Sequence, residues 1–157
     1  MSAGVHEATH PNCAKNCVRS VQRDLDSTRG WNGSTHYNQL WVLDVQDRQW
    51  SQLWTGEGTI SLGNPGLAVD TAGTALYRFG GYERIAGQYM NVLERFDLSS
   101  GDMWEVLDVS GELPEPRRFN LGGKGLFYDV ARDRLVMLGG RGSSGAWLGD
   151  VWTIYLP

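Results

Sequence analysis

The residues best suited to bind a metal lie near the start of the chain. His6, His10, Cys13 and Cys17 all carry side chains that coordinate zinc, and they occur as His-x3-His-x2-Cys-x3-Cys. The spacing is tight, and the long segment that normally separates two ligand pairs in a zinc finger is missing. We therefore expect a metal-free segment with two free thiols, as in a reducing compartment, and retain a zinc site on these four residues as the alternative.

The rest of the chain offers few catalytic combinations. The last histidine is His36, so a Ser-His-Asp triad would have no base in the region that follows. The glycine-rich run at 122–125 matches no phosphate-binding motif and falls within an expected strand. Glu112 and Glu115 have the pattern of loop carboxylates. We expect no enzymatic activity and no cofactor from these residues.

Charge and hydropathy argue against two classes of partner. The net charge is −4 and the sequence pI is about 5.3, whereas nucleic-acid-binding domains usually carry clustered Lys and Arg with a high pI. The chain contains no run of about 18 apolar residues that could cross a membrane. The first residues, 1–12, are polar and lack the apolar core of a signal peptide. We expect a protein of the cytoplasm or the nucleus.

Two glycine doublets mark the elements of the chain. Gly80-Gly81 and Gly139-Gly140 each follow a short apolar run, and Gly139 comes 59 residues after Gly80. A repeat of about 50 residues is typical of kelch-type arrays. We predict that these four glycines adopt positive φ or leave no room for a Cβ atom.

A second set of residues recurs with the doublets. Asn38 to Asp44 is followed by Trp50, Asn91 to Asp97 is followed by Trp104, and the block returns from Asp150 onward. The similar spacing, six residues after Asp44 and seven after Asp97, predicts that Trp50 and Trp104 occupy equivalent buried sites on the last strands of successive units. A large indole ring is normally buried between sheets.

These features together resemble the kelch repeat, over residues 28–157. The resemblance implies an all-β fold of four-stranded antiparallel meanders, arranged as blades of a β-propeller. It implies a protein–protein interaction module, scaffold or adaptor. The alternative is a fragment of a kelch-fold enzyme, similar to galactose oxidase or another type, whose catalytic residues lie on blades that this chain lacks.

The repeat divides the chain into segments. Residues 1–27 share nothing with it and are expected to form a flexible arm. Residues 28–54 form half a blade, with strands at 39–44 and 49–54. A full blade covers 66–108, with strands at 66–70, 75–79, 92–98 and 103–108. A blade without its fourth strand covers 114–157, with strands at 122–129, 134–138 and 151–156.

An incomplete ring leaves apolar blade faces open. Propellers close with about four to eight blades, and this chain has about two and a half. We expect a piece of a larger propeller protein, or a chain that self-associates through its exposed faces. Otherwise the arm would cover an open edge, with residues 18–21 as the missing strand of the last blade.

The loops beside the doublets are the candidate binding surface. In kelch propellers that this chain resembles, the residue after the double glycine and the start of the innermost strand line one mouth of the ring. Tyr, Trp and Arg are also enriched in interface hot spots. The residues at or beside these positions are Trp31, Tyr82, Arg84, Arg118, Phe119 and Arg141.

Overall fold

The computed structural model describes residues 21–22, 39–44, 46–56, 60–101, 103–119 and 125–156. Within these ranges every regular element is a strand, and the strands form four antiparallel sheets. The all-β class predicted from the glycine-rich turns and aromatic strands is therefore confirmed. The zinc candidates His6, His10, Cys13 and Cys17, together with Trp31, lie outside the described residues.

The central sheet is a four-stranded meander. Its strands follow one another in the order β5 (Gly66–Val69), β6 (Ala75–Phe79), β9 (Leu93–Asp97) and β10 (Trp104–Val106). All four were predicted, with ends that differ by one or two residues. Every residue of β6 is buried, which is typical of a strand whose sheet is covered on both faces.

The N-terminal sheet contains three strands in the order β1 (Val21–Gln22), β2 (Leu40–Asp44) and β3 (Gln49–Trp54). The last two were predicted. β1 lies in the segment expected to be an arm, and it pairs with β2. The suggestion that this part of the arm completes the last blade is therefore wrong, because the backbone of Val21 pairs with Val42, in the N-terminal sheet.

The C-terminal sheet is built on a long hairpin. β13 (Arg134–Gly142) pairs with β12 (Leu126–Asp129) on one side and with β14 (Trp147–Tyr155) on the other, and its end also pairs with β11 (Arg117–Arg118). We predicted that β13 ends at Leu138 and β14 begins at Val151. Both strands are longer, because the glycine doublet forms an irregularity after Leu138 and pairing resumes at Gly140.

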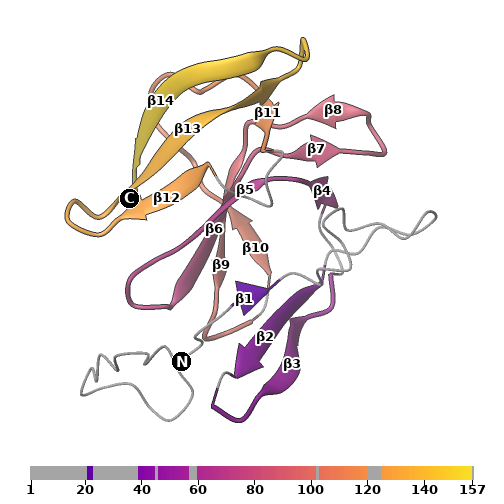
Figure 1. Cartoon of the computed structure of the whole chain (residues 1–157), viewed down its shortest axis with the longest axis vertical. Coiled ribbons are helices and arrows are strands. Elements are labelled where there is room, and N and C mark those ends of the chain that lie inside the picture. The colour runs from indigo at the N-terminus through magenta and orange to yellow at the C-terminus, as the bar shows by residue number, and fades with distance from the viewer. Residues whose placement is uncertain are drawn as a thin grey trace, which may run out of the picture.

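A fourth, small sheet extends from the central repeat. It consists of β4 (Leu62–Gly63), β7 (Tyr82–Glu83) and β8 (Gln88–Tyr89), in the order β4-β7-β8. Gly80 and Gly81 separate β6 from β7, so this doublet ends a strand, whereas Gly139 and Gly140 only shift the register within β13. Figure 1 shows β7, β8 and β11 close to the C-terminal end of β13.

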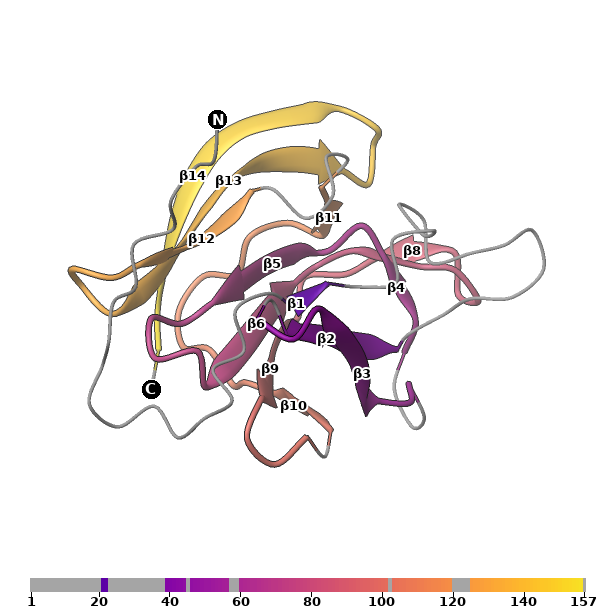
Figure 2. The same cartoon turned by 60° about the horizontal axis from the view of Figure 1, so that its bottom comes forward.

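Two hydrophobic cores hold the three larger sheets in a stack, with the central sheet between the other two (Figures 1 and 2). The core toward the N-terminal sheet consists of Leu40, Trp54, Leu76, Phe96, Leu98 and Trp104. The core toward the C-terminal sheet consists of Ala68, Ala75, Tyr77, Phe79, Leu93, Phe119, Leu126, Leu135, Met137 and Ile154. Burial of these side chains is the main favourable contribution to the stack.

The two tryptophans of the repeat have matching register but different burial. Trp104 lies opposite Phe96 and Trp50 opposite Leu43. Trp104 is only 7% exposed, whereas Trp50 is 46% exposed, so the prediction that Trp50 is buried is wrong. The N-terminal sheet covers the face that carries Trp104, but Leu43 and Trp50 lie on the far side of that sheet from the core. Trp54 enters the core instead, through a register shift in the β2–β3 pair.

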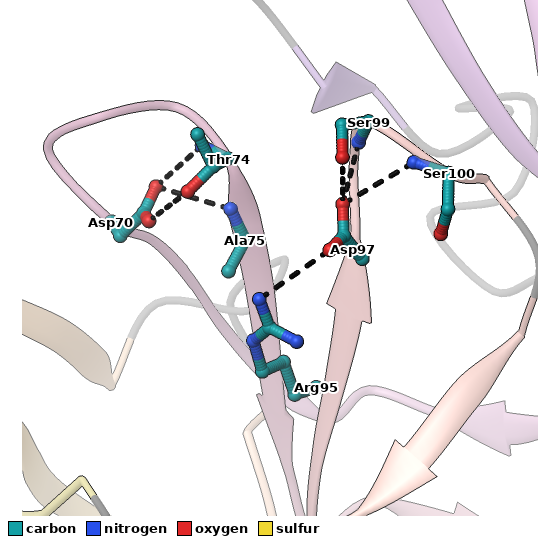
Figure 3. Close-up of polar contacts among 7 residues, drawn as sticks. All are labelled: Asp70, Thr74, Ala75, Arg95, Asp97, Ser99 and Ser100. Carbon is teal, nitrogen blue, oxygen red and sulfur yellow. Dashed lines mark hydrogen bonds and ion pairs between the residues drawn. The ribbon is translucent and has the colours of Figure 1, made fainter.

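Aspartates fix the turns that end the strands. Asp97 accepts hydrogen bonds from the backbone N–H of Ser99 and Ser100 and from the Ser99 hydroxyl (Figure 3). The Ser99 bonds hold the pKa of Asp97 below its usual value. Asp44, its counterpart in the N-terminal sheet, accepts two backbone N–H bonds in the same way. Asp70 accepts bonds from Thr74 and Ala75 at the β5–β6 turn (Figure 3). Such side-chain bonds favour a turn over a continued strand.

Candidate functional site: a tyrosine–arginine surface beside the glycine doublets

The glycine doublets allow backbone segments to come unusually close. All four glycines have positive φ, as predicted: Gly80 +64°, Gly81 +104°, Gly139 +55° and Gly140 +116°. A Cβ atom on Gly80 would lie 2.5 Å from the Arg117 carbonyl oxygen, and one on Gly139 would lie 2.6 Å from that of Leu148. Real Cβ contacts are not this short, so only glycine lets β11 and the start of β14 pass at these distances.

The close approach fixes β11 against the central repeat. The Gly81 N–H donates to the Arg117 carbonyl oxygen at 2.7 Å, and the Arg117 N–H donates to that of Met90 at 3.0 Å. Two residues further, the Phe119 N–H donates to the Asn64 carbonyl oxygen at 2.7 Å. The backbone around Arg118 is therefore held on both sides by hydrogen bonds to the central repeat.

Arg117 ties the same segment to the C-terminal sheet. Its side chain is fully buried and donates two hydrogen bonds to the Asp150 carboxylate, at 2.7 and 2.8 Å. It also donates to the Gly139 carbonyl oxygen at 2.8 Å. The Arg117 bonds lower the pKa of Asp150 to about 2. Paired guanidinium and carboxylate groups of this geometry are strong and directional, so β11 and β14 have one defined relative position.

The next residue, Arg118, points to a pair of tyrosines. Its guanidinium carbon lies 5.5 Å from the centroid of the Tyr89 ring, a cation–π contact. Tyr89 is the cross-strand neighbour of Tyr82 in the β7–β8 hairpin, and their rings meet edge to face at 5.4 Å. The Nε atom of Arg118 is buried and has no hydrogen-bond partner in the described part of the chain.

A second arginine lies directly beside Arg118. Arg118 of β11 and Arg141 of β13 are register partners, so two cationic side chains occupy neighbouring strands. Arg141 donates from Nε to the Gly145 carbonyl oxygen at 2.9 Å, within the turn of its own hairpin. We call the four half-buried residues linked by these ring contacts and this strand register the Tyr–Arg surface: Tyr82, Tyr89, Arg118 and Arg141.

The predicted binding residues are only partly brought together. Tyr82, Arg118 and Arg141 belong to the Tyr–Arg surface, and Arg84 is exposed in the β7–β8 turn. In that turn the Glu83 carboxylate accepts backbone N–H bonds at 2.8 and 2.5 Å. Phe119 is 2% exposed and lies in the core between the central and C-terminal sheets, so its assignment to the surface is wrong. Its ring fills the space beside Gly66 and Gly125.

Tyr89 is the surface residue that sequence reasoning missed. It comes seven positions after Tyr82 and is not among the residues predicted from the positions beside the doublets. The stretch between them is a short hairpin, with a glycine at +69° at Gly87. An aromatic residue on each side of a glycine-containing turn is a signal for such cross-strand pairs, and it could have identified Tyr89.

The chemistry open to this surface is recognition by charge and stacking. Arginine guanidinium groups match carboxylates, and tyrosine rings offer apolar area with a polar end. No group of three or more His, Cys, Asp or Glu side chains with metal-ligating geometry occurs among the described residues.

Comparison with known proteins supplies no assignment. No protein-family model matches the chain, and no curated protein matches it with significance. In the ranges that the structure describes, no helix is long and apolar enough to cross a membrane.

Proposed function

We propose that this chain is a kelch-type repeat protein whose sheets are propeller blades, and that it binds a protein partner through the Tyr–Arg surface. The kelch resemblance rests on the recurring doublets, aspartates and tryptophans of the sequence. The four-stranded meander, its stacking between two further sheets and the positive φ of all four doublet glycines support it.

One observation carries the binding role. The two doublets, 59 residues apart, bring Tyr82 and Arg141 to one surface together with Arg118. All four residues of the Tyr–Arg surface lie on paired strands, and sites built on strands are positioned more precisely than sites on loops. Tyr and Arg are over-represented among residues that dominate binding energy at protein interfaces. A rigid scaffold that presents both kinds of side chain is suited to recognise a partner.

The surface favours a partner with acidic side chains. Arg118 and Arg141 add two positive charges in adjacent strands, on a chain whose net charge is −4. The planar guanidinium groups can donate paired hydrogen bonds to a carboxylate. The Tyr89 ring lies beside the Arg118 guanidinium group and against the Tyr82 ring, so the two rings would contact the apolar part of the same segment.

The experiment compares partner capture by matched variants. The wild-type chain, Arg118→Ala and Tyr89→Ala serve as baits, and Arg132→Ala is the control. Arg132 lies in the β12–β13 turn, is 64% exposed and makes a 3.2 Å surface ion pair with Asp129, which contributes little to stability.

A captured protein supports the proposal only if Arg118→Ala and Tyr89→Ala lose it and Arg132→Ala retains it. With that protein purified, truncation of a hot-spot residue should weaken binding by about thirtyfold or more in calorimetric titration. Equal affinity of all four baits would overturn the assignment of the Tyr–Arg surface.

A further inference from the structure

The two sheets at the ends of the stack each have an apolar outer face, and no hydrophobic core of described residues lies against either face. The C-terminal face is the outer side of β12, β13 and β14, and it carries Phe127, Val136, Leu138 and Val151. The first and the last two are 49%, 45% and 65% exposed, and cross-strand register aligns Phe127 with Val136 and Leu138 with Val151.

The N-terminal face is the outer side of β2 and β3, and it carries Trp41, Leu43 and Trp50. Leu43 lies opposite Trp50. The register shift beside Leu40 turns Leu40 and Trp54 into the core and leaves these three residues on the other side. Half of the Trp50 surface is accordingly exposed.

The C-terminal face corresponds to a face that is buried in the central sheet. Leu138 precedes its glycine doublet as Phe79 precedes the other. Phe79 pairs with Leu93 as Leu138 pairs with Val151. In the central sheet these positions lie in the core under the C-terminal sheet. The same positions of the repeat are thus buried once and exposed once.

The N-terminal face corresponds to the opposite side of the repeat. Leu43 and Phe96 each precede the aspartate that ends their strand, and each lies opposite the tryptophan of its unit. Phe96 and Trp104 are buried under the N-terminal sheet, whereas Leu43 and Trp50 are uncovered. The chain makes the same kind of sheet-to-sheet contact twice, between the N-terminal and central sheets and between the central and C-terminal sheets. The two exposed faces correspond to the two sides of that contact.

We propose that the N-terminal face of one copy of this chain packs on the C-terminal face of a second copy, head to tail. Such a contact joins different surfaces on the two partners, and it closes into a ring when the rotation between copies permits. Two copies together contain six stacked sheets, and this number lies within the range of about four to eight blades with which propellers close.

The test measures the mass of the full chain by sedimentation equilibrium from micromolar to submillimolar concentration. We expect a concentration-dependent dimer. Trp50→Glu and Leu138→Glu place a charge in opposite faces, and each alone should weaken association by more than about tenfold, because an unpaired charge is costly in an apolar contact. Ile85→Glu adds the same charge at a 97% exposed position in the β7–β8 turn and should associate as the wild type does.

A mixture of the two variants identifies the head-to-tail geometry. Trp50→Glu retains its C-terminal face and Leu138→Glu its N-terminal face, so one intact contact forms between them and the mixture should dimerise more strongly than either variant alone. If a charged variant fails to fold by circular dichroism, Trp50→Ser and Leu138→Ser replace the pair.

Three results would overturn the proposal. A wild-type monomer at all concentrations excludes self-association. Loss of dimer in Leu138→Glu but not in Trp50→Glu indicates a symmetric contact through the C-terminal face alone. A mixture no stronger than its components excludes complementary faces. None of these results depends on the Tyr–Arg surface, so they leave the proposed partner binding unaffected.

Discussion

At Trp104 a single side chain joins several contacts. Its ring lies 5.4 Å from that of Phe96 and directly under the Arg78 guanidinium carbon, at 4.1 Å from the ring centroid. Trp54 adds a third ring to the cluster, at 6.1 Å from Phe96. Three of the six buried residues in the core between the N-terminal and central sheets are therefore aromatic, and such ring clusters contribute beyond the area that they bury.

We predict that Trp104→Ala lowers the free energy of unfolding by about 3–5 kcal/mol, the usual loss for a buried aromatic side chain. Trp50→Ala, in the equivalent register position, should cost about 1 kcal/mol or less at low protein concentration, because Trp50 is half exposed. Urea denaturation of both variants checks this. Equal losses of unfolding free energy in the two variants would contradict the prediction that the more exposed tryptophan contributes less to stability.

Substitutions at Gly80 and Gly111 distinguish the cost of backbone strain from the cost of a clash between a Cβ atom and a neighbouring segment. Both have positive φ, +64° and +99°, but a Cβ atom at Gly111 would meet nothing within 4 Å. Gly111→Ala should cost about 1–2 kcal/mol from the backbone conformation alone. Gly80→Ala should cost roughly 1–3 kcal/mol more, because its methyl group overlaps the Arg117 carbonyl. Thermal unfolding of the two variants measures the difference.

Between elements, β6 and β9 share a buried ion pair. Arg78 donates to both carboxylate oxygens of Glu94, at 2.5 and 2.7 Å, and the two side chains are only 1% and 11% exposed. They are cross-strand neighbours in the middle of the central sheet. A pair of this kind contributes little net stability compared with apolar residues, but either partner alone is a costly buried charge.

We therefore predict that Glu94→Leu destabilises the protein by about 3–5 kcal/mol, since it leaves the Arg78 charge unpaired. The double variant Arg78→Met with Glu94→Leu should recover a large part of this loss. Chemical denaturation of the wild type, both single variants and the double variant provides a double-mutant cycle. A double variant no more stable than Glu94→Leu would contradict the expectation.

At the scale of the whole molecule, Arg117 connects the central repeat to the C-terminal sheet. Its backbone bonds reach Gly81 and Met90, and its side chain reaches Asp150. Asp150 also accepts a 2.6 Å bond from the Trp152 indole. The relative position of the two repeats depends on this ionised carboxylate as well as on the apolar core.

Acid should weaken this connection over a defined pH range. The pKa of Asp150 falls from 3.8 to about 2, chiefly through the Arg117 hydrogen bond. Because the folded-state pKa is below the unfolded one, the contribution is complete above pH 3.8 and is lost as the pH falls through about 2. Thermal melts of the wild type and Asp150→Asn should differ most above this range and converge below it. A constant difference down to about pH 2 would contradict the assignment.

Much of the fold was determined by short-range features of the sequence. The strands of the central sheet and the two strands β2 and β3 follow from apolar runs between turn residues, and these signals are local. The positive φ of the four doublet glycines also follows from a local signal. Two consecutive glycines after a strand indicate a backbone conformation that would strain any other residue.

Only the tertiary structure decided which repeated positions are buried. Trp50 and Trp104 have the same register, and they follow Asp44 and Asp97 by six and seven residues. Their exposure differs because the N-terminal sheet covers the face of the central sheet that carries Trp104, whereas no described residues form a core over the equivalent face of the N-terminal sheet. Phe119 is buried for the same reason, because it fills the space beside Gly66 and Gly125 in the core between two sheets. Tyr89 differs, since the local β7–β8 hairpin places it next to Arg118. Whether a core position is buried depends on which sheets pack against each other, and the local spacing of residues in the sequence does not predict that packing.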